Sequence, residues 1–581
     1  MKKTPPTFTR RKLIKGISAA SLLPILGSNL IGCSDSSDGG GPPPEPPVES
    51  IPAQFNHGVA SGDPLSDGVI LWTRVTPERD GNVVVEWEIA SDEGFTDIVA
   101  SGSGTTTAEV DYTVKVDAGG LDPDTSYYYR FITGETVSPT GRTRTVPSGA
   151  LTAATFAVVS CSNYPAGYFH VYREVANQQL DAVLHLGDYI YEYDKDGFAS
   201  ETAEELGRVV DPETELLSLE DYRRRYAQYH TDADLQACHG AHPFIIVWDD
   251  HEVANDAWRD GAENHDPETE GEYSERRAAA IQAWYEWLPV RPPASEQEII
   301  YRRFQYGGLV DLLMLDTRHV GRDKQLSFSD YTNGDIIDVP GLRAAIADSN
   351  RSLLGADQRA WLKSRLTDSN ARWQVLGQQV LMSRNALPEP VTRLLNAAAE
   401  GEDTLEEGIA AVLAALNAKN KPPEERTPEE QELLDSAIPY NLDPWDGYGF
   451  EREEILEHAS QLQSRLVVLA GDTHNGWASQ LTTEDGSVAG VEFAAASVSS
   501  PGLEYYLGLQ PAELLGPIVV TLVDDLKYAN LVHRGYLAVT FTADDVEASW
   551  HYVSGVDTPE YTLLEDQQKQ FTVRRDDLLL G

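Results

Sequence analysis

The sequence predicts an α/β domain whose sheet is covered on both faces, preceded by a small all-β domain. After Ala150, apolar runs of strand length such as "TFAVVSCSN" and "RLVVLAGDTHN" end in polar residues, and helical stretches such as "GADQRAWLKSRLTDS" lie between them. Continuous apolar strands that alternate with helices indicate a sheet buried on both faces. Before Pro147, short alternating segments such as "VVVEWEIA" are separated by turns such as "RDGN". This spacing is typical of a small antiparallel sandwich of immunoglobulin-like or fibronectin-like type.

Changes in composition divide the 581 residues into segments. The predicted boundaries are 1–32 for a targeting segment, 33–54 for a linker, 55–148 for the β domain, 152–560 for the larger domain and 561–581 for a C-terminal tail. The linker is rich in glycine, proline and serine, which is typical of a disordered tether. The stretch 394–437 is alanine-rich and acidic. We interpret it as a helical insertion with a flexible break.

The charge balance is strongly acidic, with 93 acidic residues against 45 basic ones and a net charge of -48. Bulk electrostatics of this sign excludes nucleic acid and anionic membrane surfaces as favoured partners. A solvated surface suited to a salty medium explains the acidity without any function. An anionic substrate would need a local positive centre, which the sequence has to provide.

The N-terminus carries two export signatures. "TRRKLIKG" places paired arginines before a short, weakly apolar run, which is the twin-arginine pattern. The run ends in "LIGC", from Leu30 to Cys33, which resembles a bacterial lipobox and implies cleavage before a lipidated Cys33. The alternative is a chance match within an ordinary signal peptide. We expect a protein exported by the twin-arginine pathway to the periplasm or cell surface, in contact with a membrane only through a lipid anchor at Cys33.

Polar residues gather at the ends of the predicted strands of the larger domain. In sheets of this kind the ligand site lies beyond the carboxyl ends of the strands. Five of the six apolar runs end there in residues able to bind a metal or phosphate: Cys161, Asp188, Asp249 with Asp250, Asp316 with Arg318, and Asp472 with His474. One polar strand end is a turn, whereas five together predict a site.

Two of these strand ends carry ligand types for a hard cation or for iron. In "GDTHN", Asp472 and His474 stand two residues apart, so both can face one metal. In "WDDHEVAND", Asp249 or Asp250 can bind a hard cation, His251 can donate a proton or bind phosphate, and Asn255 adds an amide oxygen. The competing interpretation of the second motif is an acidic helix N-terminus.

The motif "GDYIY" suggests a second metal beside the first. Asp188 can bridge two cations through its two oxygens, and Tyr191 can bring a phenolate to one of them. Phenolate suits a strongly Lewis-acidic ion such as ferric iron. The alternative for Tyr191 is a buried aromatic with a packing role.

The cysteine at the first strand end has competing roles. Cys161 can bind iron or zinc as a thiolate, and its place at a strand end favours this. A disulfide with Cys238 is the other possibility for an exported protein. The two roles exclude each other.

The ordered set SCSN, GDYIY, WDDHE, LDTRH and GDTHN, preceded by "FNHGVASGDPLSDGVILWTRVTP", closely resembles the PhoD-type alkaline phosphatases. These are a branch of the calcineurin-like and purple-acid-phosphatase-like metallophosphatases. The resemblance covers about 55–553. It implies a two-sheet αββα sandwich with a small N-terminal β domain, and a site that holds Fe3+ and Ca2+. The lipobox and the helical insertion depart from the family pattern.

The resemblance also implies a ligand set and a mechanism. Iron is expected on Cys161, Asp188, Tyr191 and His474, and calcium on Asp188, Asp250, Asn255 and Asp472, with Asp249 as a further candidate. The two cations would clamp a phosphate oxygen while a metal-held hydroxide or oxide attacks in line.

Two further residues are candidates for catalysis. The guanidinium fork of Arg318 matches phosphate geometry, so we expect it to clamp the substrate. The alternative for Arg318 is a salt bridge to Asp316 or to the acidic surface. His251 is the candidate that protonates the leaving alkoxide.

The expected reaction is the hydrolysis of small-molecule phosphate monoesters, with diesters as a second activity. The nearest rival is a phosphodiesterase or phospholipase D-like hydrolase on the same scaffold, which would act on phospholipid or teichoic-type diesters. A non-catalytic metal-binding surface lipoprotein is the alternative from another class; it predicts interrupted ligand sets, whereas every motif in this chain is complete.

Overall fold

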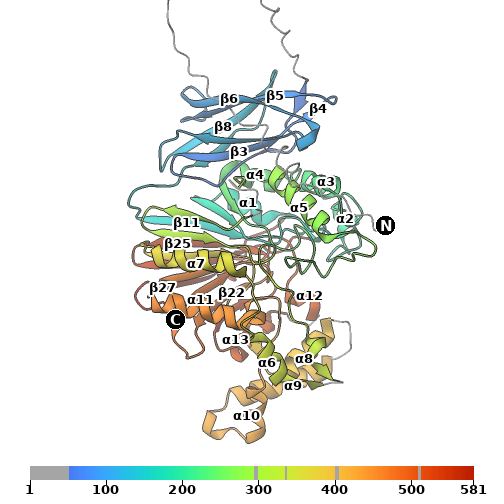
Figure 1. Cartoon of the computed structure of the whole chain (residues 1–581), viewed down its shortest axis with the longest axis vertical. Helices are drawn as coiled ribbons and strands as arrows, with labels where there is room; N and C mark the ends of the chain where they lie inside the picture. Colours follow the sequence, from blue (N-terminus) through green and yellow to red (C-terminus); the bar gives the residue numbers. More distant parts are fainter. Residues whose placement is uncertain (1–50, 294–298, 334–335, 400–404, 508–511, 581) are drawn as a thin grey trace, which may run out of the picture.

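The computed structural model describes residues 51–293, 299–333, 336–399, 405–507 and 512–580. The chain is elongated, with the N-terminal strands at one end, a two-sheet body in the middle and helices α8 to α10 at the other end (Figure 1). The predicted targeting segment, Cys33 and most of the linker lie outside the described residues.

The first sheet of the body has nine strands within the described residues. In spatial order they are β27 (Lys569–Arg574), β26 (Asp545–Tyr552), β25 (Gly535–Thr542), β11 (Ala153–Val159), β12 (Ala182–His185), β13 (Pro243–Ile246), β2 (Val59–Gly62), β3 (Gly68–Arg74) and β7 (Thr113–Gly119). The central strands β11, β12 and β13 are parallel. Their carboxyl ends therefore meet at one edge of the sheet.

The second sheet has seven strands in the part of the chain that the structure describes. They are β14 (Arg302–Tyr306), β15 (Val310–Met314), β18 (Trp373–Gln378), β21 (Leu466–Ala470), β23 (Val488–Ala494), β22 (Gly476–Thr482) and β24 (Leu526–Asn530). Strands β15, β18, β21 and β23 are parallel. Their carboxyl ends bring "LDTR" and "GDTHN" toward the ends of β11 to β13.

Large aromatic side chains join the two sheets face to face. The indole of Trp373 on β18 donates a hydrogen bond to the carbonyl of Thr542, which ends β25. The indole of Trp550 on β26 donates to the carbonyl of Ala494 on β23, and its ring lies 5.8 Å from that of Phe493. Each tryptophan thus buries a large apolar surface and satisfies its N–H across the interface.

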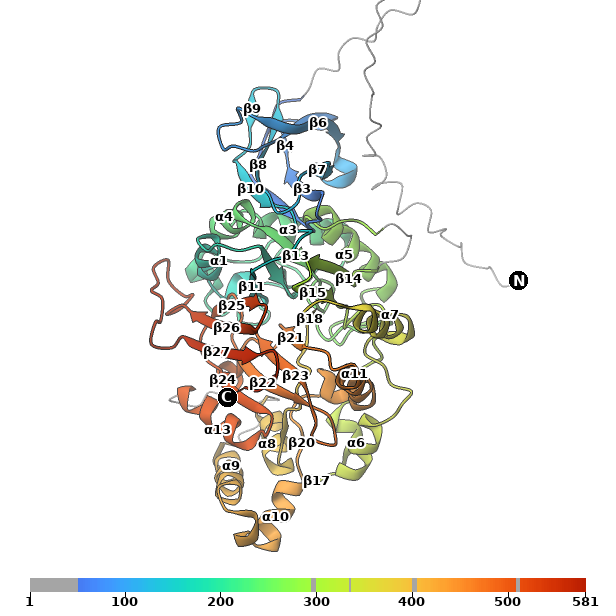
Figure 2. The same cartoon turned by 90° about the vertical axis from the view of Figure 1, so that its left-hand side faces the viewer.

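Helices cover the outer faces of both sheets. On the nine-stranded sheet these are α1 (His170–Ala176), α3 (Leu219–Tyr229), α4 (Ala233–Ala241) and α5 (Tyr273–Trp287). On the seven-stranded sheet, α7 (Gly355–Asp368) and α11 (Gly449–Gln461) pack side by side (Figures 1 and 2). The sequence marks some helix starts clearly, since Ser218 and Asp221 form a capping box at α3. The predicted two-sheet α/β sandwich is confirmed.

The N-terminal strands share a sheet with the larger body. A five-stranded sheet contains β10 (Gly141–Arg144), β8 (Ser126–Thr133), β5 (Val83–Ala90), β6 (Ile98–Thr106) and β9 (Thr136–Val137). The opposing strands β2, β3 and β7 belong to the nine-stranded sheet, because β2 pairs in parallel with β13. This pairing covers backbone groups that would otherwise be left unpaired on an edge strand. The N-terminal strands still enclose a hydrophobic core of their own.

The predicted helical insertion and the predicted C-terminal tail both form regular structure. The predicted helical insertion, 394–437, begins within α8 (Glu389–Ala399) and contains α9 (Leu405–Lys419) and α10 (Pro428–Asp435), with a short 3-10 turn between the last two. The segment assigned as a tail contains β27, which extends the nine-stranded sheet beside β26. The ring of Tyr561 also stacks on His170 at 4.3 Å.

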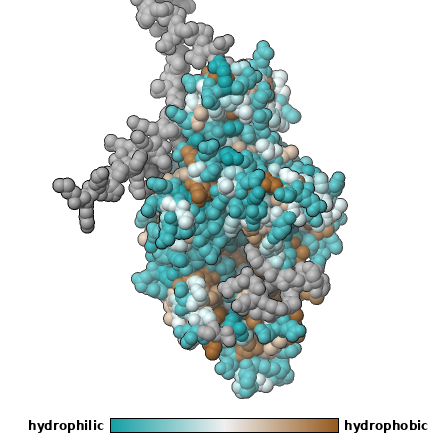
Figure 3. Space-filling model, turned by 90° about the vertical axis from the view of Figure 1, so that its right-hand side faces the viewer, coloured by the Kyte–Doolittle hydropathy of each residue, from teal (hydrophilic) through white to brown (hydrophobic). Residues whose placement is uncertain are grey.

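The remaining elements are short. They are β1 (Ala53–Gln54), β4 (Thr76–Pro77), β16 (Thr332–Asn333), β17 (Ile336–Ile337), β19 (Ala386–Leu387), β20 (Ile438–Pro439), α2 (Ala203–Leu206), α6 (Val339–Ile346), α12 (Leu503–Leu507) and α13 (Leu515–Leu522). Over the described residues, no helix combines the length and apolar character needed to cross a bilayer. The surface shown in Figure 3 is mostly hydrophilic, with apolar residues scattered over it.

Candidate metal centre

Four predicted ligands occupy an unusual backbone conformation. Cys161, Asp188, Asp472 and His474 have φ angles of 62°, 56°, 60° and 57°. This left-handed region is unfavourable for residues that carry a Cβ, and each such residue costs about 1–3 kcal/mol. Strain of this kind persists where the surrounding fold imposes it, and it concentrates at functional sites. The conformation turns each side chain sharply at the end of its strand.

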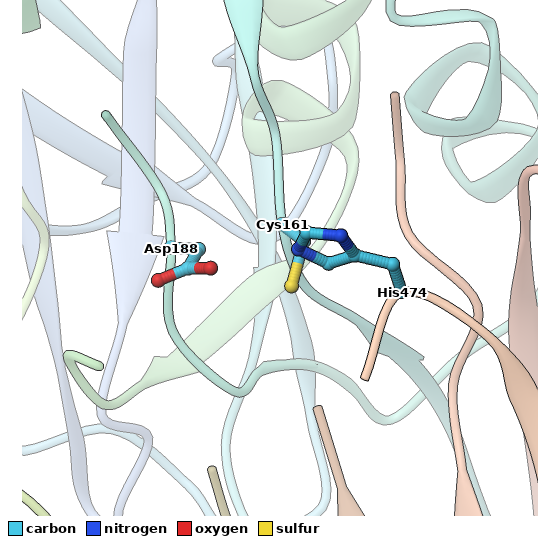
Figure 4. Close-up of side chains that lie close together, drawn as sticks. All are labelled: Cys161, Asp188 and His474. Carbon is cyan, nitrogen blue, oxygen red and sulfur yellow. The ribbon is translucent and has the colours of Figure 1, made fainter. Parts of the chain in front are cut away.

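One group of ligands lies where the two sheets meet. Side chains of Cys161 after β11, Asp188 after β12 and His474 after β21 converge, with one ligand atom from each within 4.8 Å of the others (Figure 4). The Tyr191 hydroxyl lies 3.0 Å from Asp188 Oδ2 and 3.2 Å from His474 Nε2. The Nδ1 atom of His474 lies 2.7 Å from the carbonyl of Pro501, which turns Nε2 toward the group. The structure thus brings together all four predicted iron ligands.

A second group is made of carboxylates. Ligand atoms of Asp249, Asp250 and Asp472 lie within 4.8 Å of one another, and Asp250 also lies in a group with Asp188 and His251. Asp188 and Asp250 therefore connect the two groups. Asn255 follows in the same loop, but the side-chain contact that the structure gives it is a hydrogen bond from Nδ2 to Glu263 at 3.0 Å. The carboxylates of the predicted calcium set are assembled. The role of Asn255 stays a prediction, because this bond engages its amide nitrogen and not the oxygen that would bind a cation.

Burial and crowding disturb the ionisation of both groups. Burial first, and the neighbouring Asp188 second, raise the pKa values of Cys161 and Tyr191 well above their ordinary values. Burial and nearby carboxylates, against the opposing effect of Arg318, raise the pKa of Asp472 to about 7. Burial lowers the pKa of His474 to about 3, so its imidazole is neutral and able to bind a cation. Such a set of acids holds protons that a bound cation would displace.

The residues fit the two metals that the sequence suggested. Thiol, phenol and imidazole gather in the first group, and these are donors for a transition metal such as iron. Carboxylate oxygens alone make up the second group, and these suit calcium. Buried oxygens Asp188 Oδ1 and Asp249 Oδ2 lack a hydrogen-bond partner among the described residues. A cation would satisfy both.

Arg318 holds carboxylates of the site. Its guanidinium is fully buried and donates hydrogen bonds to Asp249, to Asp443 at 2.6 Å and to Asp472 at 3.1 Å. The alternative of a salt bridge to Asp316 is wrong, because Asp316 instead accepts the backbone N–H of Arg318 at 2.8 Å. The predicted role as a phosphate clamp stays a prediction.

His251 is held by Glu192, a carboxylate that was not among the predicted site residues. Its Nδ1 atom lies 2.7 Å from Glu192 Oε2, and its ring stacks on Tyr191 at 4.2 Å between centroids. Burial lowers the pKa of His251, but Glu192, Asp188 and Asp250 outweigh this effect and raise it well above its ordinary value. Glu192 also accepts the backbone N–H of Asn255 at 2.7 Å. It therefore ties the "GDYIY" loop to the "WDDHE" loop.

Glu252 and Gly187 also hold the "GDYIY" and "WDDHE" loops together. Glu252 accepts backbone N–H groups of Asp188, Tyr189 and Asp249 at 3.1, 2.7 and 2.8 Å. Gly187 has a φ of 105°, and a Cβ there would clash with Asp249. The glycine in "GDYIY" is thus required by the close approach of the two strand ends.

The sequence did offer partial signals for these supporting residues. Glu252 is the last letter of "WDDHE", and Glu192 directly follows Tyr191. Asp443, which bonds Arg318 and Arg322, comes from "NLDPWDG" far along the chain and gave no signal. Ser500, whose hydroxyl donates to the Tyr191 oxygen at 2.7 Å, gave none either.

The two cysteines of the described body are both free and buried. Cys161 lies at the centre, whereas Cys238 belongs to α4. The disulfide alternative is therefore wrong, and the thiol of Cys161 is available to act as a ligand.

The site is open to solvent on one side. Asp249 is fully buried and Cys161, Asp188 and Tyr191 are at most 1 % exposed, whereas the Asp472 side chain is 21 % exposed. A substrate would therefore approach from the loop between β21 and β22, which carries Asp472 and His474.

Known proteins match the chain over both parts of the fold. The model of the PhoD-like phosphatase family matches residues 156–550, and that of the PhoD-like phosphatase N-terminal domain matches 43–147. Alkaline phosphatase D of Bacillus subtilis (strain 168) is 36% identical over 521 residues, which is 85% of this chain and 77% of the relative. A solved structure titled "Structure of PhoD" superposes with a TM-score of 0.73 at 32% identity, covering 92% of this chain and 93% of that one.

The matched range contains every residue of the candidate metal centre. Both the expected family and the expected enzyme class are confirmed by these matches. The chain therefore belongs to the PhoD-like phosphatase family and is a phosphoric ester hydrolase.

Proposed function

We propose that this protein is an exported phosphatase that hydrolyses phosphate monoesters, with diesters as a second activity, at an iron and calcium centre. The observation that supports it best is the pair of adjoining donor groups, one with thiol, phenol and imidazole and one with carboxylates. Asp188 and Asp250 link the groups, and the Asp472 side opens to solvent.

The residues of the chain prepare the site for a phosphate. Cys161, Tyr191 and His474 would hold the iron, Asp250 and Asp472 the calcium, and Asp188 both. When bound, the cations would neutralise the charge of the phosphate and supply the attacking nucleophile. They would be the local positive centre that the acidic chain otherwise lacks.

His251 is the group that we propose protonates the leaving alkoxide. Glu192 engages Nδ1, so Nε2 is the nitrogen that remains to deliver a proton. The same contact holds the ring in one orientation, which general acid catalysis requires. Arg318 fixes the orientation of Asp249 and Asp472, and substitutions at this residue test whether it also clamps the phosphate.

The choice between monoesters and diesters is tested by two chromogenic substrates. The purified mature protein should hydrolyse nitrophenyl phosphate with a higher kcat/KM than bis-nitrophenyl phosphate, and it should contain iron and calcium. A preference for the diester would favour the phosphodiesterase or phospholipase D-like alternative, whose substrates are phospholipid or teichoic-type diesters. Absence of iron and calcium from an active preparation would refute the proposed centre.

We further propose that the protein reaches the periplasm or cell surface through the twin-arginine pathway and is anchored by a lipid on Cys33. The paired arginines and the lipobox of the sequence support this. A Cys33→Ser variant expressed in an exporting bacterium should move from the membrane fraction to the soluble exported fraction. Equal fractionation of variant and parent would contradict the anchor.

Tyr191→Phe is expected to abolish a broad visible absorption band of the iron-loaded protein. Phenolate bound to ferric iron gives such a band, and the substitution removes only the hydroxyl. The matched control is Tyr189→Phe in the same loop, whose hydroxyl lies 2.8 Å from His239 instead. The control should keep the band. A colourless, fully active, iron-free preparation would contradict the assignment of Tyr191.

Removal of calcium by a mild chelator is expected to abolish activity, and added calcium should restore it while iron stays bound. Because the pKa of Asp472 is raised to about 7, protons compete with calcium below that pH. Calcium affinity should therefore be about tenfold weaker at pH 6 than at pH 8. Asp472→Asn should remove this pH dependence. Full activity after calcium has been stripped would exclude the role.

A further inference from the structure

A pocket lined by arginines lies at the edge of the seven-stranded sheet opposite the candidate metal centre. It has a volume of about 510 Å³, and Arg372, Arg465 and Arg575 line it. Arg372 immediately precedes β18 and Arg465 immediately precedes β21, whereas the metal ligands follow the carboxyl ends. The five residues of β21 separate the two edges by roughly 17 Å. A ligand in the pocket would therefore not compete for the metals.

The lining of this pocket is opposite in charge to the chain as a whole. The chain has 93 acidic residues among 581, which would place about two in a random set of thirteen. The thirteen lining residues contain three arginines and no aspartate or glutamate. Hydroxyl and amide side chains, including Ser369, make up much of the rest.

The three guanidinium groups have few partners of their own. Among the described residues, the Arg372 side chain has no hydrogen bond or ion pair. Arg465 donates to the carbonyl of Gln463 at 3.0 Å, and Arg575 pairs with the exposed Asp576 at 3.5 Å. The buried Nε atoms of Arg465 and Arg575 lack an acceptor within the described chain. These donors are therefore available to an anion that enters the pocket.

We propose that this arginine pocket is a second anion site that binds a phosphate group, either free or carried on a larger molecule. Arginine presents planar N–H pairs that match phosphate oxygens, and such charge-assisted hydrogen bonds are strong. Screening by salt limits the repulsion from distant carboxylates to about 8 Å at physiological ionic strength. The C-termini of α7 and α11 beside the pocket disfavour an anion, so the three arginines have to outweigh them.

A structural role for the same arginines makes a different prediction. Helices α7 and α11 end at Asp368 and Gln461, next to the pocket. Cations near helix C-termini stabilise the helix dipole. If that were their whole function, removing the arginines would change stability and leave phosphate binding unaltered.

The test is calorimetric titration of the metal-loaded protein with inorganic phosphate. The parent should show two binding events, one at the metal centre and one at the pocket. A double variant, Arg465→Gln with Arg575→Gln, should keep only the first, with kcat unchanged. The matched control is Arg574→Gln, which removes an exposed arginine beside Arg575 and should keep both events. Equal binding by the double variant and the control would overturn the proposal.

A single variant tests the proposal even if the double variant does not fold. Arg372 is exposed and without a partner, so Arg372→Gln should fold normally and weaken the pocket event about tenfold or more. An unchanged pocket event in Arg372→Gln would also overturn the proposal. Phenylphosphonate, which resists hydrolysis, distinguishes free phosphate from a phosphate group carried on a larger molecule. Binding of phosphate alone supports a free anion as the ligand, whereas binding of both supports a phosphate group on a larger molecule.

Discussion

Asp188→Asn is expected to lower kcat/KM for nitrophenyl phosphate by at least about a thousandfold. Asp188 belongs to the first donor group and also lies in a group with Asp250 and His251, which joins it to the second, so the substitution should weaken the sites of both cations at once. Charge stabilisation by metals contributes several kcal/mol to the transition state, and each 1.36 kcal/mol corresponds to a factor of ten in rate. Iron and calcium content, measured on the same sample, should fall together with the activity.

The matched control for this prediction is Asp194→Asn. Asp194 is an exposed aspartate in the same loop, so the same change of chemistry should leave activity and metal content close to those of the parent. Circular dichroism and a thermal melt establish that both variants are folded. If Asp188→Asn retained both metals and more than a tenth of the parent activity, Asp188 would not be the residue that links the groups.

Arg318→Met is expected to cause the largest loss of stability of any single substitution at the centre, about 3–5 kcal/mol in the chelated protein. The guanidinium is fully buried and pairs with Asp249, Asp443 and Asp472. Its removal leaves buried carboxylates without a compensating cation. The loss in free energy of unfolding is measured by urea denaturation, from the midpoint and slope of the transition.

The effect of Arg318→Met should depend on pH with a definite sign. Burial first, against the opposing effect of Arg318, raises the pKa of Asp472 to about 7, above its unfolded value. Ionisation of this group therefore costs stability as pH rises through about 7. Without Arg318, ionisation of Asp472 should cost more stability. The difference in free energy of unfolding between parent and variant should therefore be larger at pH 8 than at pH 6.

Two comparisons separate a scaffold role from a phosphate clamp. Arg318→Lys keeps the charge and should lose less stability than Arg318→Met, although it lacks the fork that bonds several carboxylates. Arg574→Met, at an exposed position, should unfold like the parent. If Arg318 instead clamps the phosphate, its substitution should raise KM and weaken inhibition by phosphate without changing the unfolding midpoint. That result would contradict the scaffold role.

The pattern of apolar runs ending in polar residues was sufficient to predict an α/β fold and the edge at which the site lies, whereas the division into two sheets came from the family resemblance. This worked because side-chain burial and strand length are local properties of the sequence, and parallel strands bring their carboxyl ends together. The resemblance to the family also implied that Cys161, Asp188, Tyr191 and His474 form one group, which the structure assembles.

Other features depended on contacts between distant segments. The motif that suggested Asn255 as a ligand could not reveal that its amide turns to Glu263. The sequence could not reveal that Arg318 also bonds Asp443, 125 positions further along the chain. The pairing of β2 with β13, which joins the N-terminal strands to the larger sheet, likewise involves backbone groups that leave no mark on residue type.

The sequence by itself determined the chemistry available at this site: which thiol, phenol, imidazole and carboxylates follow which buried strands. Only the tertiary structure decided which of them share a cation, which are held by Glu192 and Glu252, and which face Arg318. The physical reason is that donor type is a property of one residue, whereas ligand geometry and pKa depend on distances of a few ångströms between strands remote in sequence. Folding supplies those distances, and it does so at the cost of the left-handed backbone at Cys161 and Asp188.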